Sequence, residues 1–310
     1  MTAFKPVAET VRFSLLLCAI VPLLRGQPAP STPDQTFKAG ASQITVSIAP
    51  SVSQKPEDIL HWVHLAADAV TSYYCEYPVP AVHVSVKAGG GEPINSGHEH
   101  AGRFISISLD RKATARDVRH DWMLTHEMFH LGFPSLDRRY HYLEEGLSDY
   151  LEPLARVRIG QISEQRVWRD FIEGMPNGLP KVGDGGLDGT EDWGRTYWGG
   201  CMFWLLADMD IRQRTHNAKS LDDAIIAIVT AGGTGGSEWS LDKVIQTADT
   251  ATGTDSLRKI HQLLGVERYA PPLNKLWDRL GVRENSDGQI IFNPTAPLAS
   301  VRQALTARKH

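Results

Sequence analysis

The feature that most constrains this chain is the run His126-Glu127-Met128-Phe129-His130, an H-E-x-x-H pattern in an apolar, helix-like segment. Residues four positions apart project from the same face of an α-helix, so both imidazoles can bind one metal ion. Glu127 is turned away from that face but remains close enough to act on a metal-bound water. A zinc hydrolase needs two neutral nitrogen ligands and a carboxylate base. The run therefore predicts zinc ligands at His126 and His130, with Glu127 as the general base.

A third zinc ligand is predicted in the next helical segment, where residues 143–149 read L-E-E-G-L-S-D. Glu145 completes a three-ligand site for one zinc ion, which leaves the fourth position to water. Glu144 is the alternative ligand, because helix phase is uncertain by a residue or two. Asp149 follows Glu145 by one helical turn, so we expect it to accept a hydrogen bond from the far nitrogen of a ligand histidine.

These residues carry a family resemblance. His126-Glu127-x-x-His130 followed by Glu145-Gly-x-Ser-Asp149 resembles the gluzincin metallopeptidases, and residues 197–223 are most similar to the glycyl aminopeptidase family. The similarity covers about residues 55–285 and is strongest over 116–151 and 196–224. The gap between His130 and Glu145 is shorter than in the best-known members.

The resemblance implies a thermolysin-like, two-lobed zincin fold and hydrolysis of peptide bonds. It favours Glu145 over Glu144 as the third ligand. It also implies that Tyr197 donates a hydrogen bond to the oxyanion of the tetrahedral intermediate. The alternative for Tyr197 is an ordinary core aromatic residue at a helix start.

The segment Gly97-His98-Glu99-His100 only partly matches the strand that binds substrate backbone in those enzymes. Glu99 is the candidate for the acidic group that an aminopeptidase needs to bind the substrate amine, and both aminopeptidase and endopeptidase activity stay open. We interpret His98 and His100 as solvated loop residues rather than a second metal site, and His141 as a surface residue at a helix start.

The hydrophobic periodicity predicts an α+β fold, with an α/β lobe at about residues 41–135 and a helical lobe at about 136–310. Alternating patterns predict strands at 44–49, 81–88, 104–109 and 289–294, with a Gly-rich connection between the second and third. Helical patterns are present at 56–75, 114–131, 141–157, 196–215, 220–233, 239–249, 255–265 and 272–282. We expect a cleft between the two lobes.

The amino-terminal segment has the pattern of an export signal. Lys5 and Arg12 precede or border an apolar run at 13–24, which is shorter than the roughly twenty residues of a membrane span. We predict a signal peptide at 1–26, cleavage between 26 and 29, and a Pro-rich linker at 27–40; an uncleaved anchor is the alternative. The expected location is secreted or periplasmic. There Cys75 and Cys201 either form a disulfide or remain free thiols.

Composition excludes several classes of protein. Thirty-two Lys and Arg against thirty-six Asp and Glu give a net charge of −4, so the basic excess of a nucleic-acid binder is missing. Hydrophobic residues at 42% and charged residues at 22% exclude wholesale disorder. The expected partner is a peptide or protein substrate, with no membrane contact beyond the N-terminal segment. The sequence does not indicate an oligomeric state.

Together these patterns predict an exported zinc metallopeptidase. One alternative is a non-catalytic, zinc-containing module that binds peptides or cell-wall components. Another is a metal-free helical protein in which the H-E-x-x-H pattern at residues 126–130 is accidental. The general-base candidate Glu127 favours the enzyme, because a purely structural zinc site does not need it.

Overall fold

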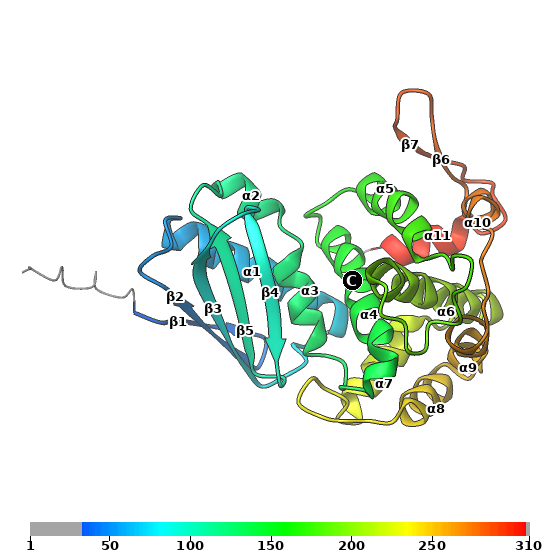
Figure 1. Ribbon diagram of the computed structural model, residues 1–310, viewed down its shortest axis with the longest axis horizontal. Helices are drawn as coiled ribbons and strands as arrows, with labels where there is room; N and C mark the ends of the chain where they lie inside the picture. Colours follow the sequence, from blue (N-terminus) through cyan, green and yellow to red (C-terminus); the bar gives the residue numbers. More distant parts are fainter. Residues whose placement is uncertain (1–32, 308–310) are drawn as a thin grey trace, which may run out of the picture. The chain divides into compact units, whose positions relative to one another are not determined.

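The computed structural model describes residues 33–307, so the predicted signal peptide at 1–26 and residues 27–32 of the predicted linker lie outside the described residues. The chain first forms a five-stranded mixed sheet with the strand order β1-β2-β3-β5-β4 (Figure 1). Its central strands β2, β3 and β5 are parallel, and β1 and β4 pair antiparallel at the two edges. The strands are β1 (Gln35–Ala39), β2 (Ser42–Ile48), β3 (Ala81–Gly89), β4 (Ile94–His100) and β5 (Phe104–Asp110).

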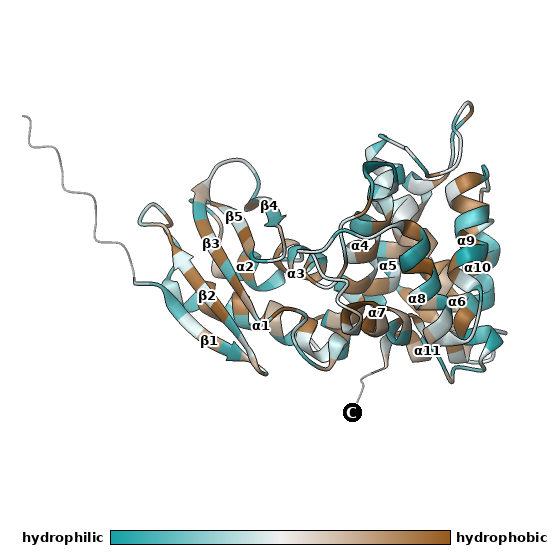
Figure 2. Ribbon diagram, turned by 90° about the horizontal axis from the view of Figure 1, so that it is seen from below, coloured by the Kyte–Doolittle hydropathy of each residue, from teal (hydrophilic) through white to brown (hydrophobic). Residues whose placement is uncertain are grey.

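Alternation of buried and exposed residues along the central strands explains this sheet. Along β2 and β5 buried residues alternate with more exposed ones, and the buried set packs in one core with helix α1 (Pro56–Tyr74). Figure 2 shows the matching alternation of hydrophobic and hydrophilic residues along the strands. The strands predicted at 44–49, 81–88 and 104–109 and the helix at 56–75 are confirmed.

Both edge strands differ from the sequence-based expectation. β1 occupies residues that the sequence places in the Pro-rich linker, and β4 lies in the predicted Gly-rich connection. Neither edge strand has a strong alternation of hydrophobic and polar residues. An edge strand with polar residues gains its order from pairing with the neighbouring strand. Sequence periodicity is therefore weak at these two positions.

The single helix predicted at 114–131 is wrong: the segment forms α2 (Ala115–His120) and α3 (Met123–His130). A capping box formed by Thr114 and Asp117 starts α2. Asp121 then adopts an extended conformation, and its carboxylate accepts the backbone N–H groups of Met123 (3.1 Å) and Leu124 (3.0 Å). This buried side chain satisfies the first donors of α3 and so starts the helix that carries H-E-x-x-H.

The remaining elements are mainly helical. Helices predicted at 141–157, 196–215 and in the four later segments are confirmed, although the second begins with a π-helical turn, η3 (Arg195–Gly199). The sequence reasoning missed α5 (Glu164–Gly174) and the final helix α11 (Ala299–Thr306). The other elements are α4 (His141–Arg158), α6 (Gly200–Arg214), α7 (Leu221–Thr230), α8 (Leu241–Thr252), α9 (Ser256–Ile260), α10 (Leu273–Leu280) and the hairpin β6 (Val282–Glu284) and β7 (Ile290–Phe292). Short helical turns are η1 (Arg138–Tyr140), η2 (Met175–Gly178) and η4 (His261–Val266).

Helices α4 and α6 touch backbone to backbone. A Cβ on Gly146 would lie 2.2 Å from the carbonyl carbon of Gly200, and one on Gly200 would lie 1.9 Å from the carbonyl oxygen of Tyr142. Only glycine permits this approach. It brings the end of η3, which carries Tyr197, against the helix that carries Glu145.

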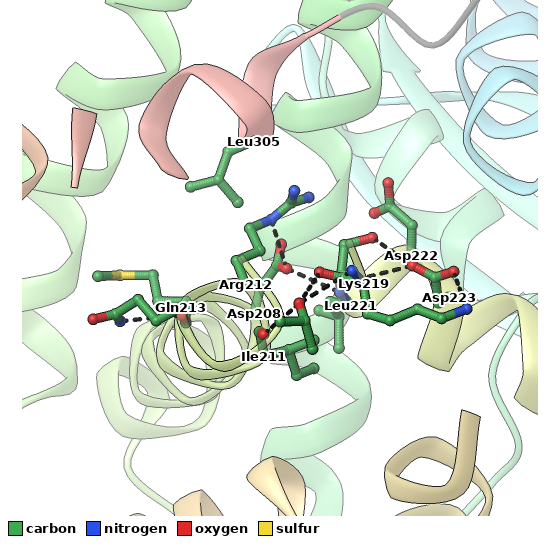
Figure 3. A network of polar contacts seen from close by, with 12 residues as sticks. Asp208, Ile211, Arg212, Gln213, Lys219, Leu221, Asp222, Asp223 and Leu305 are labelled. Atoms are coloured by element: carbon green, nitrogen blue, oxygen red, sulfur yellow. Dashed lines mark hydrogen bonds and ion pairs between the residues drawn. The ribbon is translucent and has the colours of Figure 1, made fainter. Parts of the chain in front are cut away.

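A buried polar network joins α6 and α7 (Figure 3). Asp208 accepts hydrogen bonds from Arg212 Nε (2.9 Å), the backbone N–H of Leu221 (2.9 Å) and the hydroxyl of Tyr150 on α4 (2.9 Å). Nearby, Arg158 of α4 pairs with Asp222 at 2.9 Å. Because every one of these charges is paired, the network holds the helices in one arrangement without leaving an isolated buried charge.

The disulfide alternative for Cys75 and Cys201 is not realised. Both are free thiols; Cys75 is exposed after the end of α1, whereas Cys201 is buried in α6. Burial raises the pKa of the Cys201 thiol well above its ordinary value. Between residues 33 and 307, no helix combines the length and apolar character needed to cross a membrane.

Candidate metal centre

Three side chains from two helices converge on one point. His126 and His130 lie one turn apart on α3, and their Nε2 atoms are 3.2 Å from each other. From α4, Oε2 of Glu145 lies 3.2 Å from His126 Nε2 and 3.6 Å from His130 Nε2. Within residues 33–307 this is the one cluster of three or more His, Cys, Asp or Glu side chains arranged to hold a metal ion.

The donor set fits zinc. In a tetrahedral site with bonds of 2.0–2.1 Å, neighbouring ligand atoms are about 3.4 Å apart, and the separations here are 3.2, 3.2 and 3.6 Å. A metal ion between the two imidazole nitrogens and the carboxylate oxygen would bind all three atoms at once. Two histidines and a glutamate also match the ligand types of catalytic zinc sites.

Glu144, the alternative third ligand, has a different role. Its Oε1 accepts the backbone N–H of Leu136 at 2.9 Å, and it is not part of the cluster. Burial raises its pKa, although the hydrogen bond from Leu136 opposes the shift.

Each ligand candidate is held by a neighbour. His126 Nδ1 lies 2.9 Å from Oδ1 of Asp149, the partner expected from the sequence. His130 Nδ1 lies 3.3 Å from Oγ of Ser148, and Glu145 Oε1 lies 3.3 Å from Nε2 of His141. The sequence reasoning missed the contacts of Ser148 and His141. Ser148 lies three residues after Glu145 on the same helix, and His141 lies four residues before it. This spacing is the sequence signal that points to both contacts.

The electrostatics favour positive charge at this point. Burial by itself lowers the pKa of His126, but the carboxylates of Asp149 and Glu145 raise it to about 10. Burial likewise raises the pKa of Glu145, but the hydrogen bonds from His126 and His130 outweigh it and hold that pKa far below its usual range. The site therefore favours a cation among its carboxylates, either a proton or a metal ion.

Glu127 lies between α3 and the edge strand β4. It is 7% exposed and lines the cleft beside the cluster. A Cβ on Gly97 of β4 would lie 2.7 Å from Glu127 Cγ and 2.8 Å from its Oε1. The β4 backbone thus contacts the general-base candidate directly, and only glycine allows that distance.

Tyr197 lies beside His126, in the π-helical turn η3. Its ring stacks on that of His126, with centroids 6.3 Å apart and planes at 23°. Burial first, and then the charge of Glu145, raise the pKa of the phenol, so Tyr197 keeps its proton at neutral pH. The ring is half-buried and lines the cleft instead of packing in the core. π-helical turns of this kind are frequent at functional sites.

The cleft has a volume of about 1520 Å³ and is lined by residues of β4, α3, α4, α5 and the segment 193–198. Glu99 lies in it, and its carboxylate accepts the backbone N–H of Gly102. Burial raises the pKa of Glu99, and the nearby carboxylates of Glu127 and Glu144 add to that shift. His98 and His100 also line the cleft but belong to no metal-binding cluster among the described residues.

No protein-family model matches this sequence, and no curated protein matches it. Solved structures do match. An aminopeptidase N family protein from Idiomarina loihiensis is 15% identical, with a TM-score of 0.61, over 80% of this chain and 49% of that one. An M1 zinc metallopeptidase from Deinococcus radiodurans is 17% identical, with a TM-score of 0.52, over 78% of this chain and 52% of that one.

This chain spans about half the length of the solved structures it matches. At this level of identity the likeness concerns the fold. The described residues therefore have the α+β, two-lobed zincin fold that the resemblance to gluzincins implies.

Proposed function

We propose that this protein is a zinc metallopeptidase in which His126, His130 and Glu145 hold one zinc ion. The observation that carries the proposal is the convergence of these three side chains beside Glu127, in a cleft wide enough for a peptide. A zinc ion at this position supplies Lewis acidity, which polarises a peptide carbonyl and acidifies water. The Glu127 carboxylate accepts a proton from the attacking water and passes it to the leaving amine.

Tyr197 stabilises the developing oxyanion through its phenolic O–H. Its position in the cleft beside His126 supports this role, because a protonated phenol there can donate a hydrogen bond. Ring contacts with both His126 and Trp193 restrict the ring before substrate binds. Asp149 orients His126 by holding its Nδ1.

The substrate main chain binds along β4. This strand pairs with β5 on one side only, and its residues from Asn95 to His100 line the cleft. An edge strand has free N–H and C=O groups that can pair with an extended peptide, and alternate side chains of that peptide then point into the cleft. Gly97 brings this edge close to Glu127.

We further propose aminopeptidase-like cleavage, with Glu99 as the group that binds the substrate amine. The support is the position of Glu99 in the cleft, where burial and the carboxylates of Glu127 and Glu144 raise its pKa and a neighbouring ammonium group would stabilise its charged form. Comparing peptides that have a free or an acetylated amino terminus separates the two modes. An endopeptidase cleaves both, whereas an aminopeptidase cleaves only the free form.

We also propose that the enzyme acts outside the cytoplasm, secreted or periplasmic. The support is the basic residues and short apolar run within residues 1–26. Fractionation of the producing cells, with amino-terminal sequencing of the mature chain, tests this proposal.

The decisive experiment for the activity is Glu127→Gln, assayed on a peptide pool with cleavage sites mapped by mass spectrometry. We expect about 10²- to 10⁴-fold slower turnover with one zinc ion still bound. Glu173→Gln, an exposed glutamate that also lines the cleft, is the matched control and should retain activity. Unchanged turnover in Glu127→Gln would exclude the mechanism, and bound zinc without chelator-sensitive cleavage would favour the non-catalytic binding module.

A further inference from the structure

Two tryptophans are exposed inside the cleft. The side chains of Trp122 and Trp193 are 47% and 64% exposed, and both line it. The other large apolar side chains with substantial exposure in residues 33–307 lie outside the cleft; they are Val182, Val266, Tyr269 and Ile291. Exposed indole surface is thus concentrated beside the candidate metal centre.

Ring contacts connect both tryptophans to the candidate metal centre. Trp122 packs edge-on against His126, with centroids 5.6 Å apart and planes at 85°. Tyr197 stacks on His126, and Trp193 stacks on Tyr197 at 5.3 Å and 27°. One tryptophan therefore lies directly beside a ligand candidate, and the other is separated from it by the oxyanion-binding candidate.

Stacking on Tyr197 does not account for most of the Trp193 surface. A residue that only supported Tyr197 would bury its ring against the protein, but Trp193 remains 64% exposed. Indole faces favour aromatic rings and apolar side chains, and binding sites typically combine such surfaces with a few polar groups. Trp122 and Trp193 thus each present an open indole face to the cleft, and such a face can bind an apolar side chain of a ligand.

The arrangement of α3 and β4 indicates which substrate residue this surface meets. Gly102, after β4, lies near His130 at the carboxyl end of α3, as their shared close contact with Gly235 shows. Glu99 is three residues from Gly102 and accepts its N–H. Trp122 precedes α3 at the other end. A peptide with its amine at Glu99 and its first carbonyl at the metal centre therefore continues toward Trp122.

We propose that Trp122 and Trp193 form an aromatic subsite for the side chain that follows the scissile bond, and that the enzyme prefers peptides with an aromatic or large aliphatic residue there. This inference rests on the proposed function and adds the substrate class. Neither residue takes part in proton transfer; both act by binding the leaving-group side chain.

The test compares kcat/KM for the peptides Ala-Phe-Ala-Ala and Ala-Ala-Ala-Ala. We expect the intact enzyme to favour the phenylalanine peptide at least tenfold, mainly through KM. Trp122→Ala and Trp193→Ala should each reduce this ratio at least threefold, whereas Trp193→Phe, which keeps an aromatic face, should retain most of it. Tyr269→Ala, an exposed aromatic outside the cleft, is the matched control and should leave both rates unchanged.

The ratio separates the subsite from an indirect effect on Tyr197. Loss of support for Tyr197 would slow both peptides equally and leave the ratio unchanged, and that result overturns the proposal. A ratio near one in the intact enzyme overturns it as well.

A second measurement keeps the subsite testable if the intact protein cleaves neither peptide. That outcome would count against the proposed function. Calorimetric titration of zinc-loaded Glu127→Gln with the same peptides then decides the subsite separately. Tighter binding of the phenylalanine peptide that is lost in Glu127→Gln/Trp193→Ala supports it, and equal affinities for the two peptides overturn it.

Discussion

At the scale of single residues, the two histidine ligand candidates are held by groups of different strength. Asp149 places a carboxylate 2.9 Å from His126 Nδ1, whereas Ser148 places a neutral hydroxyl 3.3 Å from His130 Nδ1. A carboxylate partner fixes the tautomer and raises the basicity of an imidazole more than a hydroxyl does. The two contacts should therefore differ in how much they contribute to zinc affinity.

We expect Asp149→Asn to weaken zinc binding about 10- to 100-fold and Ser148→Ala to weaken it less. Competition with a chromogenic chelator measures both affinities. Asp170→Asn is the matched control, because Asp170 also lines the cleft but pairs with Arg166 on α5. Equal affinities for Asp149→Asn and the unaltered protein would contradict this account of His126.

Glu152, one turn beyond Asp149 on α4, is predicted to make stability depend on pH. It is buried beside Arg156, and burial raises its pKa from 4.5 to about 7 although Arg156 opposes the shift. Because the folded-state pKa is the higher one, this group contributes stability that is complete below about pH 4.5 and is lost as the pH rises through 7. The loss from pH 5 to pH 8 amounts to about 3 kcal/mol.

Glu152→Gln should remove this part of the pH dependence. Urea unfolding at pH 5, 6, 7 and 8, with zinc saturating, measures the slope of the free energy of unfolding for each protein. Glu173→Gln, on the exposed side of α5, should keep the original slope. Parallel slopes for Glu152→Gln and the unaltered protein would show that Glu152 is ionised in the folded state.

At the scale of elements, the critical contact is between β4 and α3. The break at Asp121 begins α3 independently of α2, and Gly97 lets β4 approach Glu127 and Met123. A Cβ at position 97 would lie 2.9 Å or less from side-chain atoms of both residues, so these side chains would have to shift. The position of the general-base candidate thus depends on a glycine in a different element.

Gly97→Ala should lower kcat/KM at least tenfold while zinc remains bound, because the added methyl group displaces the Glu127 side chain. Gly90→Ala, directly after β3, is the matched control, because a Cβ there would lie 4.0 Å from the nearest atom, an oxygen of Asp110. Peptidase assays with metal analysis of the same samples check both variants. An active Gly97→Ala enzyme would mean that Glu127 does not need this contact.

At the scale of the whole molecule, the metal-ligand candidates join two parts of the fold. α3 contacts the sheet through β4, and α4 contacts α6 and the later helices; α3 lies between the sheet and α4 (Figure 1). An ion bound to His126, His130 and Glu145 bridges α3 and α4, whereas without it two imidazoles and a carboxylate remain crowded together. Binding that occurs only in the folded state stabilises that state.

Removing zinc should therefore lower the melting temperature, and adding zinc back should restore it. At a free zinc concentration a thousandfold above Kd, the bound ion contributes about 4 kcal/mol. Thermal unfolding with and without a chelator measures the shift. His126→Ala should show a much smaller response to the chelator, and an unaltered protein that does not respond would contradict a zinc site that is coupled to folding.

The sequence by itself determined the features that depend on local spacing. Four-residue spacing is enough to put His126 and His130 on one helix face, and periodicity is enough to locate α1, α4 and the central strands. It also placed Asp149 one turn from Glu145. These relations hold within one helix or strand and need no knowledge of the remaining chain.

Only the tertiary structure decided which elements meet. It separated Glu145 from Glu144, ordered the edge strands β1 and β4, ended α2 at Asp121, and left Cys75 and Cys201 apart. It also brought Trp122 and Trp193 into one cleft from positions 71 residues apart in the chain. The physical reason is that local periodicity shows which side of a helix or strand is buried. Which other element that side packs against is decided by close packing across the core.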